Sequence, residues 1–318
     1  MSFTMNNNPL LSILMPTYNH EKFIAQAIES VLMQRTDFEY ELLIAEDCSK
    51  DRTKDIVVEY QKKYSDRINL LLQDKNIGMH KNFAGAYRVC RGKYIALLEG
   101  DDYWTTPYKL QKQIDFLERN NDFSICFHNM QITYEDKPQL NHKSNRRQKQ
   151  ITTIKDLACG NYIYTASCIF RKKLHEMPSW FYQCPIGDYP LHLLNAQYGK
   201  IKFIDEVMGV YRIHRGGVWE NRSLSYRLEE WIKMLESIRT NFSEEINQIL
   251  NNSLCNFSFT LAKHCLRNGD FDRYNFYLRK LKSNSLIFST KLEIWVLNIM
   301  YFLKTHGKKD FKTNKTSV

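Results

Sequence analysis

Four consecutive residues, Glu99-Gly100-Asp101-Asp102, carry the strongest local signal for chemistry in the sequence. Carboxylates this close together repel one another unless a cation neutralises them. Hard divalent cations such as Mg²⁺ and Mn²⁺ prefer oxygen ligands and often bridge phosphates while keeping some of their waters. A metal held by one or two carboxylates would therefore stabilise the negative charge on a departing diphosphate. Gly100 would let the backbone approach a ligand closely. An acidic turn that caps the helix beginning near Pro107 would explain the same four residues without any ligand.

This acidic segment follows the last of four short apolar runs, which alternate with helical patterns in the first hundred residues. The runs predict strands at residues 11–15, 41–45, 68–72 and 93–98. Apolar residues at helical spacing predict helices between these strands, and another at 108–120. The order β-α-β-α-β-α-β is typical of an α/β fold in which helices cover both faces of a doubly wound, mostly parallel sheet.

Two further polar segments directly follow predicted strands, at residues 16–19 and 46–49. Ligands of parallel sheets bind beyond the carboxyl ends of the strands, so both segments are candidates for a binding site. Thr17 and Tyr18, after Pro16, could hold a base through backbone groups and an aromatic ring. Asp47 could accept a hydrogen bond from a base N–H or a ribose hydroxyl. Taken alone, each of these residues is explained as well by a turn or a helix cap.

The pattern changes after residue 120. Strands are expected at 123–134, 162–170, 201–204 and 207–213, and a helix is expected at 188–197. From Ser223 onward the pattern is helical. We therefore expect a first domain of residues 1–220 and a helical C-terminal region of residues 221–318.

Composition limits the class of protein. The net charge of +10, from 45 basic and 35 acidic residues, suits nucleotide phosphates, nucleic acid or anionic lipids as partners. The eight cysteines show no C-x-x-C spacing, so we expect no zinc ribbon. The first ten residues are polar, so we expect no signal peptide and place the protein in the reducing cytoplasm. The apolar run at 292–303 is too short to span a bilayer. It predicts a buried helix or an amphipathic helix on a membrane surface, followed by lysines.

Taken together, the motifs from about Leu10 to Trp219 resemble the family 2 glycosyltransferases of the GT-A fold. The resemblance rests on residues 16–19, on 46–51 as a variant of Asp-Asp-Gly-Ser-x-Asp, on Asn76-Ile77-Gly78, and on 99–104 as the D-x-D segment. It implies a nucleotide-sugar-binding half at about 10–125, an acceptor half at 126–220, and a base contact from Asp47. It also implies Asp101 as a metal ligand, with Glu99 facing the ribose or the metal. Cys48 stands where the family usually has glycine, and Glu99 replaces the usual first aspartate.

Two later segments extend the resemblance. Gly187-Asp188-Tyr189 matches the place of the family's general base, which implies that Asp188 deprotonates the acceptor hydroxyl. A helix N-cap role for Asp188 is compatible with this. Residues 211–214 match a Tyr-Arg-x-His segment, so His214 could complete the metal shell, while Arg212 and Arg215 could neutralise phosphate charge. A surface loop with an incidental histidine is the alternative.

The resemblance implies an inverting hexosyl- or N-acetylhexosaminyltransferase that uses Mg²⁺ or Mn²⁺ and a nucleotide-diphosphate sugar, most simply a UDP-sugar. The implied acceptor is a saccharide or a lipid-linked saccharide in bacterial surface polysaccharide or glycoconjugate assembly, at the inner face of the membrane if the C-terminal region docks there. A sugar-phosphate nucleotidyltransferase is the alternative enzyme, although no glycine follows the first strand. A non-catalytic basic binding protein is the alternative outside enzymes. Nucleic acid is not expected at the acidic loops, which would repel its phosphates, and the absence of G-x-G and G-K-[ST] excludes dinucleotide and P-loop sites.

Overall fold

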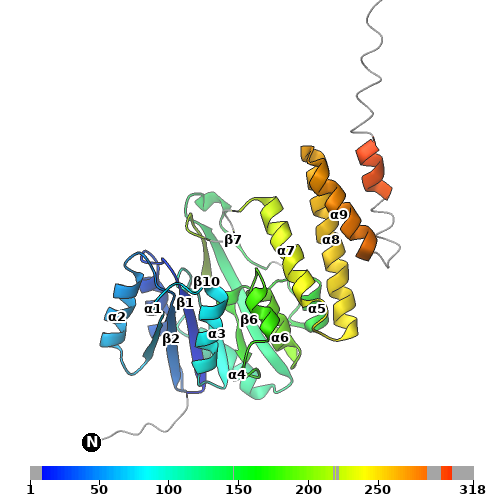
Figure 1. Ribbon diagram of the computed structural model, residues 1–318. Coiled ribbons are helices and arrows are strands. Elements are labelled where there is room, and N and C mark those ends of the chain that lie inside the picture. Colours follow the sequence, from blue (N-terminus) through cyan, green and yellow to red (C-terminus); the bar gives the residue numbers. More distant parts are fainter. Residues whose placement is uncertain (1–8, 146, 218, 220–221, 285–294, 303–318) are drawn as a thin grey trace, which may run out of the picture. The chain divides into compact units, whose positions relative to one another are not determined.

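The computed structural model describes residues 9–145, 147–217, 219, 222–284 and 295–302. The chain forms two compact units (Figure 1). The first comprises residues 1–183 and 187–220, and the second comprises residues 184–186 and 221–318. The two units are described separately below.

The first unit is built on one mixed sheet, which has ten strands within the described residues. Eight of them follow one another across the sheet in the order β3 (Ile68–Leu72), β2 (Tyr40–Glu46), β1 (Leu11–Thr17), β4 (Tyr94–Leu97), β9 (Ile169–Arg171), β6 (Phe123–Tyr134), β10 (Lys200–Ile213) and β5 (Tyr103–Trp104). The short strands β7 (His142–Lys143) and β8 (Ile151–Thr152) pair with β6 and β10. Strands β3, β2, β1 and β4 are parallel, as are β6 and β10, whereas β9 and β5 run antiparallel to their neighbours. The predicted mostly parallel sheet is confirmed.

Helices α1 (Ile24–Leu32), α2 (Thr53–Lys63) and α4 (Lys109–Arg119) bury their apolar stripes in one core with alternate residues of the strands. In α1 the stripe is Ile24, Ala27, Ile28 and Val31, which is the spacing of one helix face. Helix α3 (Met79–Val89) contacts β1 and β2 through other residues, because successive strand residues point to opposite faces. Helices α5 (Ile154–Ala158) and α6 (Asp188–Ala196) contact each other.

Two strand predictions in the second half of this unit are wrong. Residues 162–170 do not form one strand, because residues 165–167 form the 3-10 helix η2 (Thr165–Ser167) and strand pairing begins only at β9. The Ser167 hydroxyl donates to the Tyr164 carbonyl at 2.6 Å, and such local bonds compete with strand pairing. The two strands expected at 201–204 and 207–213 are a single strand, β10, which follows β6 through register shifts near Val207.

The second unit is helical, as expected for the C-terminal region. It contains α7 (Leu224–Ile238), α8 (Glu244–Asn268), α9 (Phe271–Asn284) and a helical segment at residues 295–302. Helix α7 begins where the Ser223 hydroxyl accepts a hydrogen bond from the Tyr226 N–H at 3.2 Å, and α8 ends at Gly269, whose φ of 78° suits glycine. Among the described helices, none is both long and apolar enough to cross a membrane.

Candidate active site

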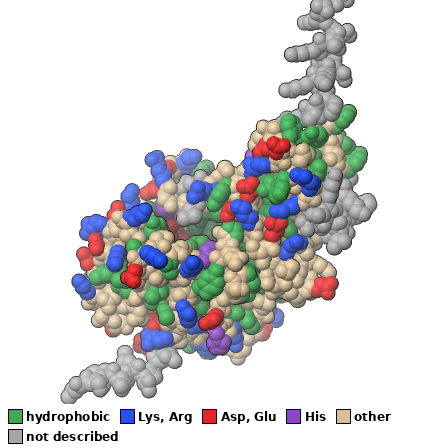
Figure 2. Space-filling model, viewed as in Figure 1, with side chains coloured by type: hydrophobic (Ala, Val, Ile, Leu, Met, Phe, Trp, Pro, Cys, Tyr) green, Lys and Arg blue, Asp and Glu red, His purple; other side chains and the backbone are tan. Residues whose placement is uncertain are grey.

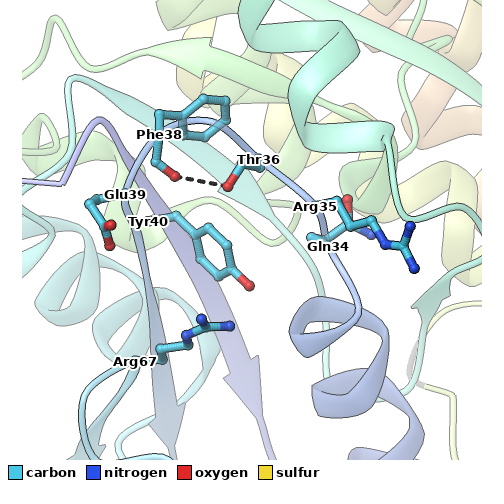
Figure 3. Close-up of a pocket in the computed structure, with 7 residues that line it drawn as sticks. All are labelled: Gln34, Arg35, Thr36, Phe38, Glu39, Tyr40 and Arg67. Atoms are coloured by element: carbon cyan, nitrogen blue, oxygen red, sulfur yellow. Dashed lines mark hydrogen bonds between the residues drawn. The ribbon is translucent and has the colours of Figure 1, made fainter.

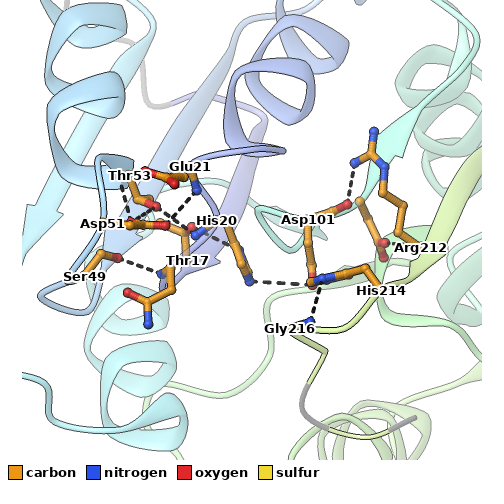
Figure 4. Close-up of polar contacts among 12 residues, drawn as sticks. Thr17, His20, Glu21, Ser49, Asp51, Thr53, Asp101, Arg212, His214 and Gly216 are labelled. Atoms are coloured by element: carbon orange, nitrogen blue, oxygen red, sulfur yellow. Dashed lines mark hydrogen bonds and ion pairs between the residues drawn. The ribbon is translucent and has the colours of Figure 1, made fainter. Parts of the chain in front are cut away.

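The three segments selected from the sequence meet at the carboxyl ends of β1, β2 and β4. The register pairs Thr17 at the end of β1 with Glu46 at the end of β2, and Leu14 with Leu97. Backbone bonds continue this alignment past the strands, since the Asp47 N–H donates to the Thr17 carbonyl at 3.1 Å and the Gly100 N–H donates to the Pro16 carbonyl at 3.2 Å. The sheet therefore brings the first, second and fourth strand ends into one place (Figure 4).

Asp101 lies between two histidines at this place. Its Oδ2 atom is 3.2 Å from His214 Nε2 and 3.6 Å from His20 Nε2. Burial alone would raise the pKa of Asp101, but the hydrogen bond from His214 and the electrostatic interactions with both histidines outweigh it and hold the pKa below its ordinary value. His214 follows β10 and His20 follows β1, so two distant parts of the first unit converge on one carboxylate. Figure 4 shows the two rings on either side of Asp101.

The hydrogen bonds around His214 bear on its predicted role as a metal ligand. The Gly216 N–H points to His214 Nδ1 at 3.2 Å, so Nδ1 acts as the acceptor and Nε2 carries the proton that reaches Asp101. A metal bound at Nε2 would need the proton on Nδ1 instead. Metal ligation by His214 therefore requires the Gly216 N–H to move away, whereas Asp101 needs no such change.

Glu99 and Asp102 lie on either side of Asp101 in the sequence, Asp102 buried and Glu99 half-buried with a buried Oε2 atom. Among the described residues, Glu99 Oε2 has no hydrogen-bond partner. Burial, and then the charges of Asp101 and Asp188, raise the pKa of Glu99 to about 8. Asp102 Oδ1 accepts the Arg212 backbone N–H at 2.9 Å, and burial raises the pKa of Asp102 well above its ordinary value. An unpartnered buried carboxylate oxygen is costly unless a ligand satisfies it, so Glu99 marks the place of a bound group.

The two arginines considered for phosphate binding have other partners. The Arg212 guanidinium donates a hydrogen bond to the Asp101 carbonyl, and its Cζ atom lies 4.3 Å from the centre of the Tyr103 ring. Arg212 therefore stabilises the backbone of the acidic turn. Arg215 Nε is 2.8 Å from Asp136 Oδ2 at the surface. Phosphate binding by these guanidinium groups, which contact Asp101, Tyr103 and Asp136 in this structure, therefore stays a prediction.

Asp188 is the first residue of α6 and is half-buried. Its Oδ2 atom accepts a hydrogen bond from Asn161 Nδ2 at 2.9 Å. Burial raises the pKa of Asp188 despite the hydrogen bonds that it accepts. Because the charge of Asp188 also raises the pKa of Glu99, the two carboxylates share one electrostatic environment. A raised pKa suits a carboxylate to accept a proton near neutral pH, so the base role of Asp188 stays a prediction.

Asp47 holds a loop in this structure. Its Oδ1 accepts the Ile77 N–H at 2.8 Å and its Oδ2 accepts the Gly78 N–H at 2.9 Å, while Asn76 Nδ2 donates to the Asp47 carbonyl at 3.1 Å. Gly78 has a φ of 86°, a conformation that glycine adopts without strain. The segments around Asp47 and Asn76 therefore form one connected rim. Each carboxylate oxygen keeps a second lone pair with which it could contact a base.

The turn after β2 keeps a glycine-like conformation without glycine. Cys48 has a φ of 57°. The buried Glu46 carboxylate secures this turn, because its two oxygens accept the Cys48 N–H at 3.2 Å and the Ser49 N–H at 2.7 Å. The replacement of glycine by Cys48 therefore leaves a left-handed turn in place. Pro16 and Tyr18 are partly exposed beside it.

Gly100 is needed for a reason other than the predicted approach to a ligand. A Cβ atom at this position would lie 2.5 Å from Thr17 Oγ1 and 2.9 Å from His20 Nδ1. These atoms come from the end of β1 and leave no space for a methyl group. The glycine allows the acidic turn to pack directly against the first strand end.

Sequence reasoning missed His20 and Glu46. His20 directly follows the Pro16–Asn19 segment, so its place near the site was visible, but no partner stands at ligand spacing from it in the sequence. The partner, Asp101, comes from another strand end. Glu46 looked like the last residue of a buried strand, and its bonds to the following turn depend on the backbone conformation.

The residues present fit a divalent cation that is bound partly by its substrate. Within the described residues, no group of three or more His, Cys, Asp or Glu side chains is arranged to hold a metal ion. Mg²⁺ commonly uses only one or two carboxylates, with substrate phosphates and water completing its shell. Asp101 and the unpartnered Glu99 oxygen provide that donor set.

A cavity of about 340 Å³ lies elsewhere in the first unit (Figure 3). Its lining comes from the loop before β2, the start of β2 and the residue before β3, namely Gln34, Arg35, Thr36, Phe38, Glu39, Tyr40 and Arg67. These positions are at the amino ends of the strands, so the cavity is separate from the acidic site at the carboxyl ends.

The chain is similar in sequence to known proteins. The model of the family described as glycosyl transferase family 2 matches residues 12–177. Rv1520, an uncharacterised protein of Mycobacterium tuberculosis, is 36% identical over 213 residues, which is 66% of this chain and 61% of that protein. The chain thus spans about three fifths of the length of that relative. The Escherichia coli enzyme WfgD, named UDP-Glc:alpha-D-GlcNAc-diphosphoundecaprenol beta-1,3-glucosyltransferase, is 37% identical over 123 residues, 39% of this chain and 46% of WfgD.

Solved structures share the fold. TarS of Staphylococcus aureus (residues 1–349), in complex with UDP-GlcNAc, superposes with a TM-score of 0.63 at 17% identity and covers 93% of this chain and 92% of its own. The mannosyltransferase PcManGT of Pyrobaculum calidifontis, in complex with GDP-Man and Mn²⁺, superposes with a TM-score of 0.58 at 13% identity, over 96% and 89% of the two chains. At such identities the likeness shows the fold, and it confirms the expected GT-A architecture. Because the family model covers more than half of its length, the chain belongs to glycosyl transferase family 2.

Proposed function

We propose that this chain transfers a sugar from a nucleotide-diphosphate donor to an acceptor hydroxyl with inversion at the anomeric carbon. The observation that carries the proposal is that Glu99 and Asp101 directly follow β4, where Glu99 Oε2 is buried without a hydrogen-bond partner among the described residues and the charge of Asp188 helps to raise the pKa of Glu99. A site of this kind can hold a bound group at the acidic turn and a base at the start of α6.

The donor would lie along the rim formed by the three strand ends. Its base and ribose would contact Thr17, Tyr18 and Asp47, with Asn76 and Gly78 shaping the same rim. Its diphosphate would lie at Asp101, where Mg²⁺ or Mn²⁺ would be held by Asp101 and Glu99, with His214 joining after its loop moves. When bound, the cation supplies positive charge to the departing diphosphate.

Asp188 would act on the acceptor. Its carboxylate takes the proton from the acceptor hydroxyl, and the freed oxygen bonds to the anomeric carbon of the donor sugar. The bond from that carbon to the diphosphate oxygen breaks at the same time, and its electron pair leaves with the nucleoside diphosphate. One displacement of this kind inverts the configuration.

Several properties of the substrates are inferred from relatives. A UDP-sugar with a hexosyl or N-acetylhexosaminyl group is favoured for two reasons. WfgD is named as an enzyme that uses UDP-Glc, and TarS was solved in complex with UDP-GlcNAc. A lipid-linked saccharide acceptor in surface polysaccharide or glycoconjugate assembly is favoured by the diphosphoundecaprenol in the name of WfgD. Such an acceptor would place the enzyme in the cytoplasm at the inner face of the membrane.

The test combines donor binding with transfer. Thermal shift with a panel of nucleotide sugars, with and without Mn²⁺, identifies the donor. We expect Asp188→Asn to keep donor affinity within about threefold and to lose transfer by at least about 10²-fold, since only the base is removed. Asp101→Asn is expected to lose metal-dependent donor binding.

Asp66→Asn is the matched control, because Asp66 is exposed and lies just before β3, at the amino end of that strand, where its Oδ2 atom is 3.8 Å from Arg67 Nε. The anomeric coupling constant of the product gives the stereochemistry. Retained configuration, or loss of donor binding together with transfer in Asp188→Asn, would contradict the proposal.

A further inference from the structure

The helical segment at residues 295–302 (Figure 1) carries exposed apolar side chains, and Figure 2 shows hydrophobic side chains on the surface of the helical unit. Trp295 is 61% exposed, Phe302 is 60% exposed, and Val296 and Ile299 are exposed as well. The segment contains no charged residue. Trp295, Ile299 and Phe302 are spaced by four and three residues, so they lie on one helix face. Large aromatic side chains exposed together on a short uncharged helix mark an interaction surface.

The opposite face of the segment is fixed to α9. Leu297 is fully buried, and the Tyr274 hydroxyl donates to the Leu297 carbonyl at 3.2 Å. The Tyr301 ring stacks on the Tyr274 ring at 5.2 Å between centroids and meets the Phe271 ring edge-on at 5.6 Å. Because Leu297 and Tyr301 are held in this way, Trp295 and its neighbours are directed outward by the packing of the unit.

The chemistry of the exposed face fits the interfacial zone of a bilayer. Tryptophan and phenylalanine are favoured where hydrocarbon meets lipid headgroups. Eight helical residues extend about 12 Å, far less than the roughly 30 Å of a hydrocarbon core, so the segment would lie along the surface. A protein partner would normally require a polar rim around the apolar centre, and apart from the single polar atoms of Trp295 and Tyr301 the side chains of residues 295–302 offer only the amide of Asn298.

The sequence that follows the segment indicates that the lipids would be anionic. Five lysines follow the segment against one acidic residue, Asp310, and they are Lys304, Lys308, Lys309, Lys312 and Lys315. Basic residues near an anionic leaflet strengthen binding to it through electrostatic attraction. An apolar face beside a basic sequence combines the two contributions that give peripheral membrane binding.

We propose that the face formed by Trp295, Val296, Ile299 and Phe302 inserts into the headgroup region of an anionic lipid surface. The inference deepens the proposed function, on which its purpose rests, because a lipid-linked acceptor is reached from that surface. The binding itself requires nothing of the acidic site.

Vesicle sedimentation with the full chain tests the proposal. The vesicles contain phosphatidylcholine alone or phosphatidylcholine with one quarter phosphatidylglycerol. We expect the wild type to sediment with the anionic vesicles, and the double variant W295S/F302S to lose about tenfold or more in partition coefficient, since it removes the two largest inserting side chains. The control is the double variant L140S/I151S, which removes two apolar side chains of the first unit that are 49% and 54% exposed. It should sediment like the wild type.

Three results would overturn the proposal. The first is equal sedimentation of W295S/F302S and the wild type. The second is equal binding of the wild type to neutral and anionic vesicles. The third is a wild-type dimer that W295S/F302S converts to a monomer in light scattering without lipid, because a second copy would then cover the face.

Transfer to a water-soluble acceptor separates this proposal from the proposed function. W295S/F302S should keep that transfer while it loses vesicle binding. A wild type that binds anionic vesicles but transfers no sugar would refute the proposed function and leave the docking surface standing.

Discussion

Lys109 gives a stability prediction whose size can be worked from the structure. It begins α4, its side chain is fully buried, and among the described residues its Nζ has no hydrogen-bond partner. Nζ lies 3.9 Å from the centre of the Trp104 ring. Burial lowers the pKa of Lys109 from 10.5 to about 7, although the thiols of Cys168 and Cys126 act in the opposite direction. The folded protein therefore disfavours the charged amine that the unfolded chain carries.

The sign and the magnitude follow from proton linkage. Between pH 7 and 10.5 the unfolded chain holds a proton on Lys109 that the folded protein does not hold, so the free energy of unfolding rises with pH across this window. Below pH 7 both states are protonated and the full cost of the buried charge is present. At pH 7 this cost is about 4 kcal/mol. The attraction between the ammonium and the Trp104 ring offsets about 1–2 kcal/mol of it. Replacement of Lys109 by methionine, which has a similar shape, should therefore stabilise the protein by about 2–3 kcal/mol at pH 7.

Urea unfolding at pH 7 and pH 10, followed by tryptophan fluorescence, measures this effect. Lys109→Met should unfold at higher urea than the wild type at pH 7. The difference should fall below about 1 kcal/mol at pH 10, because the Lys109 amine of the folded wild type is then neutral. Lys112→Met is the control, since Lys112 lies on the same helix in a surface ion pair with Glu206 and should change stability by less than about 1 kcal/mol at both pH values. A less stable Lys109→Met at pH 7, or a difference that does not depend on pH, would refute the reasoning.

Three further predictions concern the site. Gly100→Ala should lower the free energy of unfolding by about 1–3 kcal/mol and weaken donor binding in calorimetry, because its methyl group would lie 2.5 Å from Thr17 Oγ1 and displace the acidic turn. Cys48→Gly should leave stability unchanged or raise it by up to about 1 kcal/mol in a melting experiment, because relief of the positive φ of 57° exceeds or equals the entropy cost of glycine; a larger loss would show that the cysteine stabilises the turn. The acid limb of kcat/KM should lie above pH 3.8 and activity should fall as pH drops through the pKa of Asp188, which burial raises; an acid limb at or below 3.8 would exclude Asp188 as the base.

The sequence predicts those parts of the fold that depend on local patterns. Short apolar runs located β1 to β4 to within two residues, and the spacing of Ile24, Ala27 and Val31 located α1, because burial of one face imposes that spacing. The position of β9 between β4 and β6 was not predictable in this way. Strand order depends on pairing between segments far apart in the chain, and the two-residue overlap of β9 with its expected strand shows how little local pattern it carries.

The candidate site divides along the same line. The carboxylates at strand ends were found because parallel strands must end at one edge of the sheet. The partners of those carboxylates were not found, since Asp47 accepts bonds from Ile77 and Gly78, 30 and 31 residues further on, and Arg212 supports Asp101 from 111 residues away. Such bonds depend on the folded backbone of two segments at once. The roles assigned to the site residues therefore stay predictions for the experiments above.

The contact between His214 and Asp101 has a consequence for biosynthesis. The two residues are 113 positions apart, and β10 must pair with β6 before the histidine can reach the carboxylate. A nascent chain that has emerged only as far as β6 can already form β1 to β4, because those strands and their helices are complete. During synthesis the acidic turn therefore exists without its second histidine until residue 214 has left the ribosome.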